Sequence, residues 1–165
     1  WSNLLVVCCG GNQSKVVNPG QRFDADPKNY SCDVPKSDKI LDTIILNPLN
    51  LPELNIWKFH RSSGKISVNE DSCLDFGISV EMAHQTIKEL NLNSPRLIRF
   101  RKAILDNLNI LITERLKKGQ TIEQAVRFIA ISLFRKNGAG DWPSFFSATR
   151  YYLGQQAELI LAQPI

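Results

Sequence analysis

Residues 94–136 read SPRLIRFRKAILDNLNILITERLKKGQTIEQAVRFIAISLFRK, and this stretch decides the fold class of the C-terminal half. Apolar side chains recur in it every three to four residues, which is the period of an α-helix with one buried face. Ser94 followed by Pro95 is typical of a helix start, and Gly119 is typical of a helix end. The pattern therefore predicts a first helix over about 94–118.

The second helix of this stretch is expected to run from about residue 121 to 136. Thr121 and Gln124 have the spacing of a capping box, in which each side chain accepts a hydrogen bond from the other residue's backbone. The helix is apolar around most of its circumference. We therefore expect it to lie in the middle of a helix bundle or beneath a partner chain.

Two further helices flank this pair. Ser79 can cap a helix that runs to about Leu90, and Asp141 can cap a last helix that runs to about Ala162. The loops between the last three helices are short, so these helices should be antiparallel neighbours. The sequence predicts a bundle of about four helices.

The N-terminal half lacks the helical period. Residues 3–9 predict a short buried strand, and residues 10–37, rich in Gly, Pro, Asn and Asp, predict a long arm. Alternating residues on both sides of the turn at 61–64 predict a β-hairpin over 55–68. Residues 38–47 fit either a strand or a short helix.

The expected fold class is therefore α+β, with a small antiparallel β element and a long N-terminal arm packed on a C-terminal bundle of about four helices. We expect a β- and loop-rich half over 1–75 and a helical half over 76–165, together forming one compact domain. Because the chain begins with Trp1 and its only methionine is Met82, we expect a fragment or a processed product.

The cysteines are Cys8, Cys9, Cys32 and Cys73, and none of them belongs to a C-x-x-C pair. This spacing predicts free thiols in a reducing compartment, no metal site and no cofactor. No run of about 18 apolar residues is present, so we expect no membrane contact. The free thiols indicate a cytoplasmic location.

The net charge of +4 is unevenly distributed. Residues 1–75 contain 8 basic and 9 acidic side chains, whereas residues 76–165 contain 12 basic and 7 acidic ones, a net charge of +5. A basic half of this kind indicates an acidic partner, and we expect RNA or another polyanion. The candidate contact residues are Arg96, Arg99, Arg101, Lys102, Lys117, Lys118 and Arg150.

These observations predict a non-enzymatic binding and assembly protein that neutralises phosphates and reads little base sequence. Aromatic residues are favoured at protein interfaces, so Trp142, Phe146 and Tyr151 are candidates for contact with other chains or for self-association. Two alternatives remain. One is a protein–protein interaction module that binds no nucleic acid, and the other is a thiol enzyme that uses Cys73 and His60.

Overall fold

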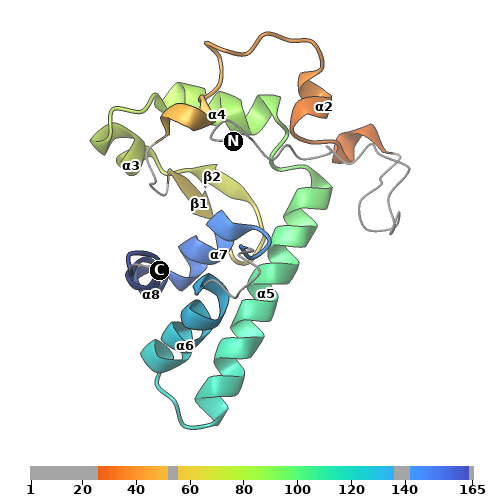
Figure 1. Cartoon of the computed structure of the whole chain (residues 1–165). Helices are drawn as coiled ribbons and strands as arrows, with labels where there is room; N and C mark the ends of the chain where they lie inside the picture. Colours follow the sequence, from red (N-terminus) through yellow and green to blue (C-terminus); the bar gives the residue numbers. More distant parts are fainter. Residues whose placement is uncertain (1–25, 52–55, 136–141, 164–165) are drawn as a thin grey trace. The chain divides into compact units, whose positions relative to one another are not determined.

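A computed structural model describes residues 26–51, 56–135 and 142–163 (Figure 1). The small two-stranded sheet and the many helices confirm the α+β class. No helix in these described ranges is both long enough and apolar enough to cross a membrane. In chain order the elements are η1 (Pro27–Asn29), α2 (Asp33–Lys36), η2 (Pro48–Asn50), β1 (Trp57–Phe59), β2 (Ile66–Val68), α3 (Glu70–Asp75), α4 (Val80–Glu89), α5 (Pro95–Lys117), α6 (Ile122–Phe134), α7 (Phe146–Leu153) and α8 (Gln155–Leu161).

The chain divides into two compact units. The first comprises Trp1–Lys58 and Ile66–Arg99, and the second comprises Phe59–Lys65 and Phe100–Ile165. The division therefore falls within α5, not near residue 75, and it assigns the turn of the β-hairpin to the second unit. Each unit has a hydrophobic core of its own.

The first unit is built around β2, α3 and α4. Its core contains Ile56, Val68, Cys73 and Ala83, all of them buried. Asn93 extends the pairing of β2, because its side-chain amide donates to Ile66 O and accepts from Ile66 N, each at 2.9 Å. These two hydrogen bonds satisfy the backbone N–H and C=O of Ile66, which the two-stranded sheet leaves unpaired.

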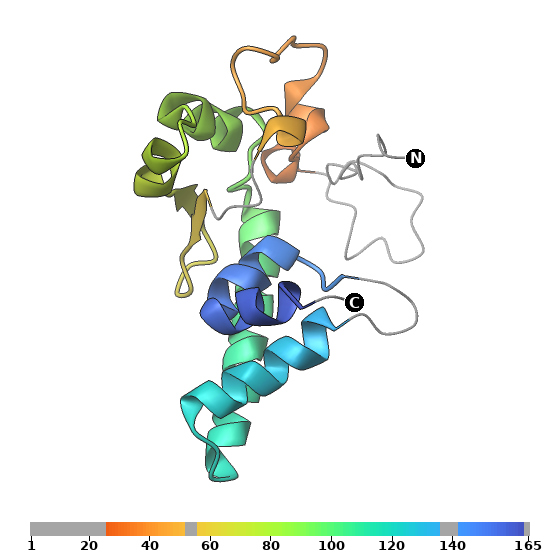
Figure 2. The same cartoon turned by 60° about the vertical axis from the view of Figure 1, so that its left-hand side comes forward.

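The second unit is helical. Leu105 and Leu108 of α5, Ile129 of α6 and Leu153 of α7 belong to one buried cluster. Figure 2 shows α7 and α8 as two short helices beside α6. In α6 the buried side chains lie on one side, while Ile122 and Phe128 remain exposed.

Three of the four helix starts that the sequence predicts, at Ser79, Ser94 and Thr121, are confirmed. Ser79 Oγ accepts a hydrogen bond from Met82 N at 3.2 Å at the start of α4. Before α6, Thr121 Oγ1 accepts from Gln124 N at 3.2 Å and Gln124 Oε1 accepts from Thr121 N at 3.0 Å, which completes the capping box. The long helix of the opening stretch spans Pro95–Lys117.

Other expectations were wrong. The last helix is two helices, because the chain breaks at Gly154, whose φ of 54° combined with a ψ of −136° is a conformation that favours glycine. Residues 38–47 form turns, neither a strand nor a helix, and α3 was not predicted. The expected strand at 3–9, much of the expected arm and the proposed cap Asp141 lie outside the described residues.

Candidate nucleic-acid interface

The β-hairpin presents two cations at its turn. Its strands are fixed by buried side chains such as Ile56 and Ile66. His60 N donates to Lys65 O at 2.8 Å, and Gly64, with a φ of 72°, reverses the chain between them. Arg61 and Lys65 are exposed there, and neither side chain forms an ion pair with any residue that the structure describes.

Two tyrosines of α7 lie next to this turn. Burial of Ala148, Thr149 and Leu153 fixes the rotation of the helix and leaves Tyr151 and Tyr152 half-buried. The helix begins after Phe145, whose φ of 53° is in the left-handed region. It ends at Gly154. Both tyrosines are therefore held on a short helix with defined ends.

Ring contacts join the hairpin to α7. The rings of Phe59 and Tyr151 are 5.6 Å apart with an interplanar angle of 58°. The Arg61 guanidinium carbon lies 5.5 Å from the centre of the Tyr152 ring. Both distances are typical of favourable aromatic and cation–π contacts. We name Phe59, Arg61, Lys65, Tyr151 and Tyr152 together the hairpin–α7 surface.

Two of the arginines expected to contact phosphate, Arg96 and Arg101, are buried. Arg96 is 6% exposed, and it donates to Ser31 Oγ at 2.7 Å and to Asn29 O at 3.3 Å. Arg101 is 4% exposed, and burial lowers its pKa to about 10, so that it remains charged at neutral pH. In this structure neither guanidinium is open to a phosphate.

Two more of these residues face acidic side chains of the same chain. Lys102 Nζ lies 2.7 Å from Asp106 Oδ2, one helical turn further along α5. Arg150 makes a bidentate pair with Glu158, at 2.7 Å and 2.6 Å, which joins α7 to α8. The positive charge of both residues is thus partly compensated within the molecule.

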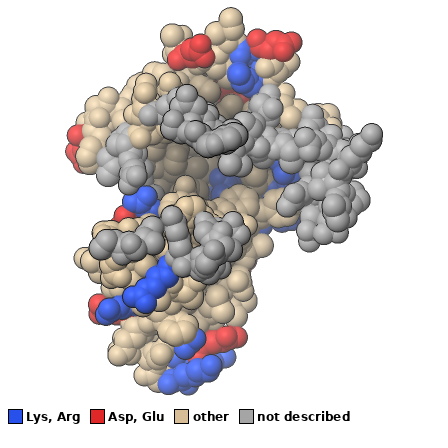
Figure 3. Space-filling view, viewed as in Figure 1, with Lys and Arg blue, Asp and Glu red and all other residues tan. Residues whose placement is uncertain are grey.

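Arg99, Lys117 and Lys118 remain exposed. Lys117 and Lys118 form no ion pair with a described residue and lie at the end of α5. Figure 3 shows blue and red atoms side by side on the visible face, without one continuous blue area. The cations on this visible face therefore do not form one continuous basic area, and nucleic-acid contact by the exposed cations remains a prediction.

The three expected interface residues lie in different surroundings. Trp142 is 47% exposed, and its ring centre is 5.1 Å from that of Phe146. Phe146 is half-buried and packs edge-on against Phe134 of the core at 5.4 Å. Tyr151 contacts the hairpin. Contact of these residues with another chain remains a prediction.

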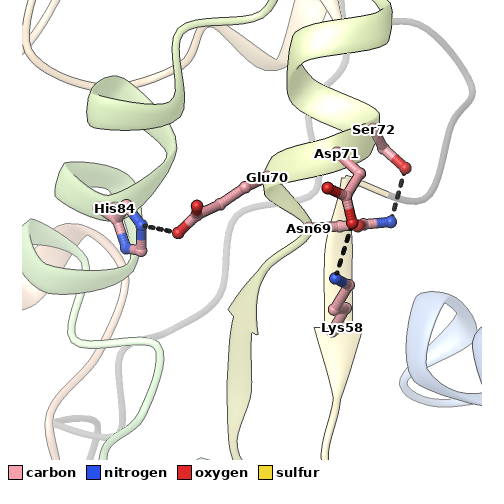
Figure 4. A network of polar contacts seen from close by, with 6 residues as sticks. All are labelled: Lys58, Asn69, Glu70, Asp71, Ser72 and His84. Carbon is pink, nitrogen blue, oxygen red and sulfur yellow. Dashed lines mark hydrogen bonds and ion pairs between the residues drawn. The ribbon is translucent and has the colours of Figure 1, made fainter.

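A network of polar contacts lies at the start of α3 (Figure 4). His84 Nε2 of α4 is 3.3 Å from Glu70 Oε1, and Lys58 Nζ is 3.5 Å from Asp71 Oδ2. All four side chains are largely open to solvent, where such pairs contribute little stability. Within the described ranges, no group of three His, Cys, Asp or Glu residues is arranged to hold a metal ion.

Cys73 is poorly suited to act as the nucleophile of a thiol enzyme that uses Cys73 and His60. Cys73 is 0% exposed, and its pKa is raised, first by burial and second by the nearby charge of Glu70. The reactive thiolate is thus disfavoured. His60, by contrast, is exposed at the hairpin turn.

Comparison with known proteins identifies one informative relative. The chain is 36% identical over 132 residues to an Escherichia coli protein named "Retron Ec83 putative HNH endonuclease". The match covers 70% of this chain and 49% of the relative, so the chain spans about half the relative's length. No family model matches the chain, and no solved structure matches it.

This relative overturns the expectation of a non-enzymatic binding and assembly protein. The chain is 36% identical to a protein whose name describes an endonuclease, an enzyme that cleaves nucleic acid. The expectation was wrong because the residue patterns of this chain contain no recognisable catalytic constellation, and such an absence does not exclude an enzyme.

The residue patterns did not single out Arg61 and Lys65, the two exposed cations of the hairpin turn. The search for basic residues followed helix faces, while these two cations flank the turn of a hairpin that was itself correctly predicted. The signal was present in the residues HRSSGK at 60–65, which put a cation on each side of the turn.

Proposed function

We propose that this chain is part of a nucleic-acid-cleaving enzyme, an endonuclease like its Escherichia coli relative. The observation that carries the proposal is the 36% identity to that relative. The described residues would contribute to holding the nucleic acid, because they offer exposed cations. RNA, the partner expected from the charge distribution, remains one candidate substrate beside DNA.

Phosphate contact is assigned to cations that are exposed in the structure. Lys117 and Lys118 fulfil this condition at the end of α5, and neither forms an ion pair with a described residue. Lysine and arginine bind phosphate by displacing condensed counterions, a mechanism that is independent of base sequence. The buried Arg96 and Arg101 are assigned a structural role.

The proposal is tested by incubating the full protein with end-labelled single-stranded DNA, duplex DNA and RNA. We expect shortened products from at least one substrate. The K117E/K118E variant should raise KM and leave kcat nearly unchanged, because it removes ground-state contacts and no reacting group.

The matched control is K36E/K88E, which makes the same charge change on α2 and α4 and should behave like the unmodified protein. Absence of products from all three substrates would contradict the proposed activity. Equal KM values for the two double variants would contradict the assignment of phosphate contact to Lys117 and Lys118.

A further inference from the structure

We propose that the hairpin–α7 surface binds single-stranded nucleic acid, with an unpaired base stacked at Tyr152 and Arg61 and the backbone phosphates held by Arg61 and Lys65. This inference rests on the proposed function and names the form of nucleic acid that this part of the second unit contacts. The relative's name assigns no role to this surface, and of its residues only Tyr151 is a candidate from the sequence, for contact with another protein chain.

The first support is the arrangement of the rings. Tyr151 and Tyr152 are adjacent on α7, and each contacts a different residue of the hairpin, Phe59 at 5.6 Å and Arg61 at 5.5 Å. Both rings are half-buried, so each is held in place and keeps part of its surface open.

The second support is the charge. Arg61 and Lys65 are exposed and have no acidic partner in the described part of the chain. Glu158, an acidic residue of the same unit, already accepts two hydrogen bonds from Arg150. The surface therefore keeps two uncompensated cations beside two rings.

The third support concerns the form of the nucleic acid. A duplex buries the faces of its bases, so rings on a protein surface can stack only with unpaired bases. A guanidinium plane offers a second stacking surface, and its charge reaches phosphates at the same time. The combination of tyrosine, arginine and lysine is therefore suited to a single strand.

The experiment measures fluorescence anisotropy of the full protein with two labelled 12-mers. One is oligo(dT), and the other is an abasic strand with the same number of phosphates. Tyr152→Ala should weaken oligo(dT) binding about 5- to 150-fold, the range for loss of one stacked base. Its binding of the abasic strand should change less than about twofold, because no phosphate contact is lost.

Two variants separate stacking from folding and from charge. Tyr152→Phe keeps the ring and should bind oligo(dT) within about twofold of the unmodified protein. The substitution R61E should weaken binding of both strands and reduce the salt slope by roughly 0.7, which corresponds to one lost phosphate contact on a single strand.

The matched control is Phe128→Ala. Phe128 is 45% exposed on α6, and the Arg115 guanidinium lies 3.5 Å from its ring centre, so this change also removes a ring beneath an arginine. It should bind both strands like the unmodified protein. Equal losses in Phe128→Ala and Tyr152→Ala would overturn the inference.

Two results would overturn the inference while leaving the proposed function intact. One is unchanged oligo(dT) binding by both Tyr152→Ala and R61E in a protein that still cleaves nucleic acid. The other is equal weakening of oligo(dT) and abasic binding by Tyr152→Ala. Failure of the unmodified protein to cleave or bind any nucleic acid would overturn both.

Discussion

At the scale of single residues, Arg96 shows how a charged side chain can be structural. Its guanidinium donates to Ser31 Oγ and Asn29 O, across more than 60 positions of sequence. Ser31 itself is fully buried. The arginine thus supplies a hydrogen bond that water cannot provide at this position.

Replacing Arg96 by leucine should lower the free energy of unfolding by about 1–3 kcal/mol, because the buried Ser31 hydroxyl loses its charged donor and keeps only the weak Cys32 thiol donor at 3.8 Å. The double variant Arg96→Leu/Ser31→Ala should recover part of this loss, since it removes both polar groups. Urea denaturation measures both effects. Lys88→Ala on α4 is the control, and a double variant as unstable as the single one would contradict this account.

Cys73 provides a prediction with a defined pH dependence. Burial and the charge of Glu70 raise the pKa of its thiol, so the folded chain holds the proton more tightly than the unfolded chain does. At pH 7 iodoacetamide should therefore modify the half-buried Cys32 before Cys73. Mass spectrometry of the labelled peptides measures the order, and faster labelling of Cys73 would refute it.

The same shift affects stability. Above the ordinary pKa of a thiol, the unfolded chain releases the Cys73 proton first. The folded state should then lose stability as pH rises.

At the scale of elements, the break between α7 and α8 depends on one glycine. Gly154 has a φ of 54° and a ψ of −136°, a conformation that residues with a Cβ avoid. No atom lies within 4 Å of the position that an added Cβ would occupy, so a substitution would meet strain without a clash.

Gly154→Ala should therefore lower the free energy of unfolding by about 1–3 kcal/mol, the usual cost of one strained residue. Thermal unfolding followed by circular dichroism measures the change. Gln155→Ala, at the next and exposed position, is the control and should change stability by less than about 0.5 kcal/mol. A Gly154→Ala variant more stable than the unmodified protein would contradict this prediction, because it would mean that α7 and α8 join into one helix.

Elements determined by neighbouring residues were predictable from the sequence. The caps at Ser79 and Thr121 and the hairpin around residues 61–64 depend on side chains within a few positions, and all of them are present. The glycine between α7 and α8 was overlooked, because an isolated glycine in an apolar pattern does not by itself end a helix.

The candidate site could be predicted only in part. Hydrogen bonds such as Arg96 to Ser31 and ring contacts such as Arg61 to Tyr152 join residues far apart in sequence. A helical wheel places Arg96 and Arg99 on one polar face. It cannot show that Ser31, from a distant part of the sequence, packs against Arg96. Local periodicity therefore identified the helices and misjudged which of their cations are accessible.

At the scale of the whole molecule, the chain consists of two compact units with separate cores. The exposed cations assigned to nucleic acid belong to the second unit, both at the hairpin turn and at the end of α5. We assign these cations to holding the substrate.

The central claim is that the described cations contact nucleic acid, and the salt dependence of binding tests it most directly. Anisotropy titrations of the full protein with a single-stranded oligonucleotide should give a plot of log K against log salt concentration with a slope of roughly −3. This value follows from about four phosphate contacts by Arg61, Lys65, Lys117 and Lys118. Reversing all four charges should bring the slope close to zero, whereas an unchanged slope, or no binding by the unmodified protein at low salt, would contradict the claim.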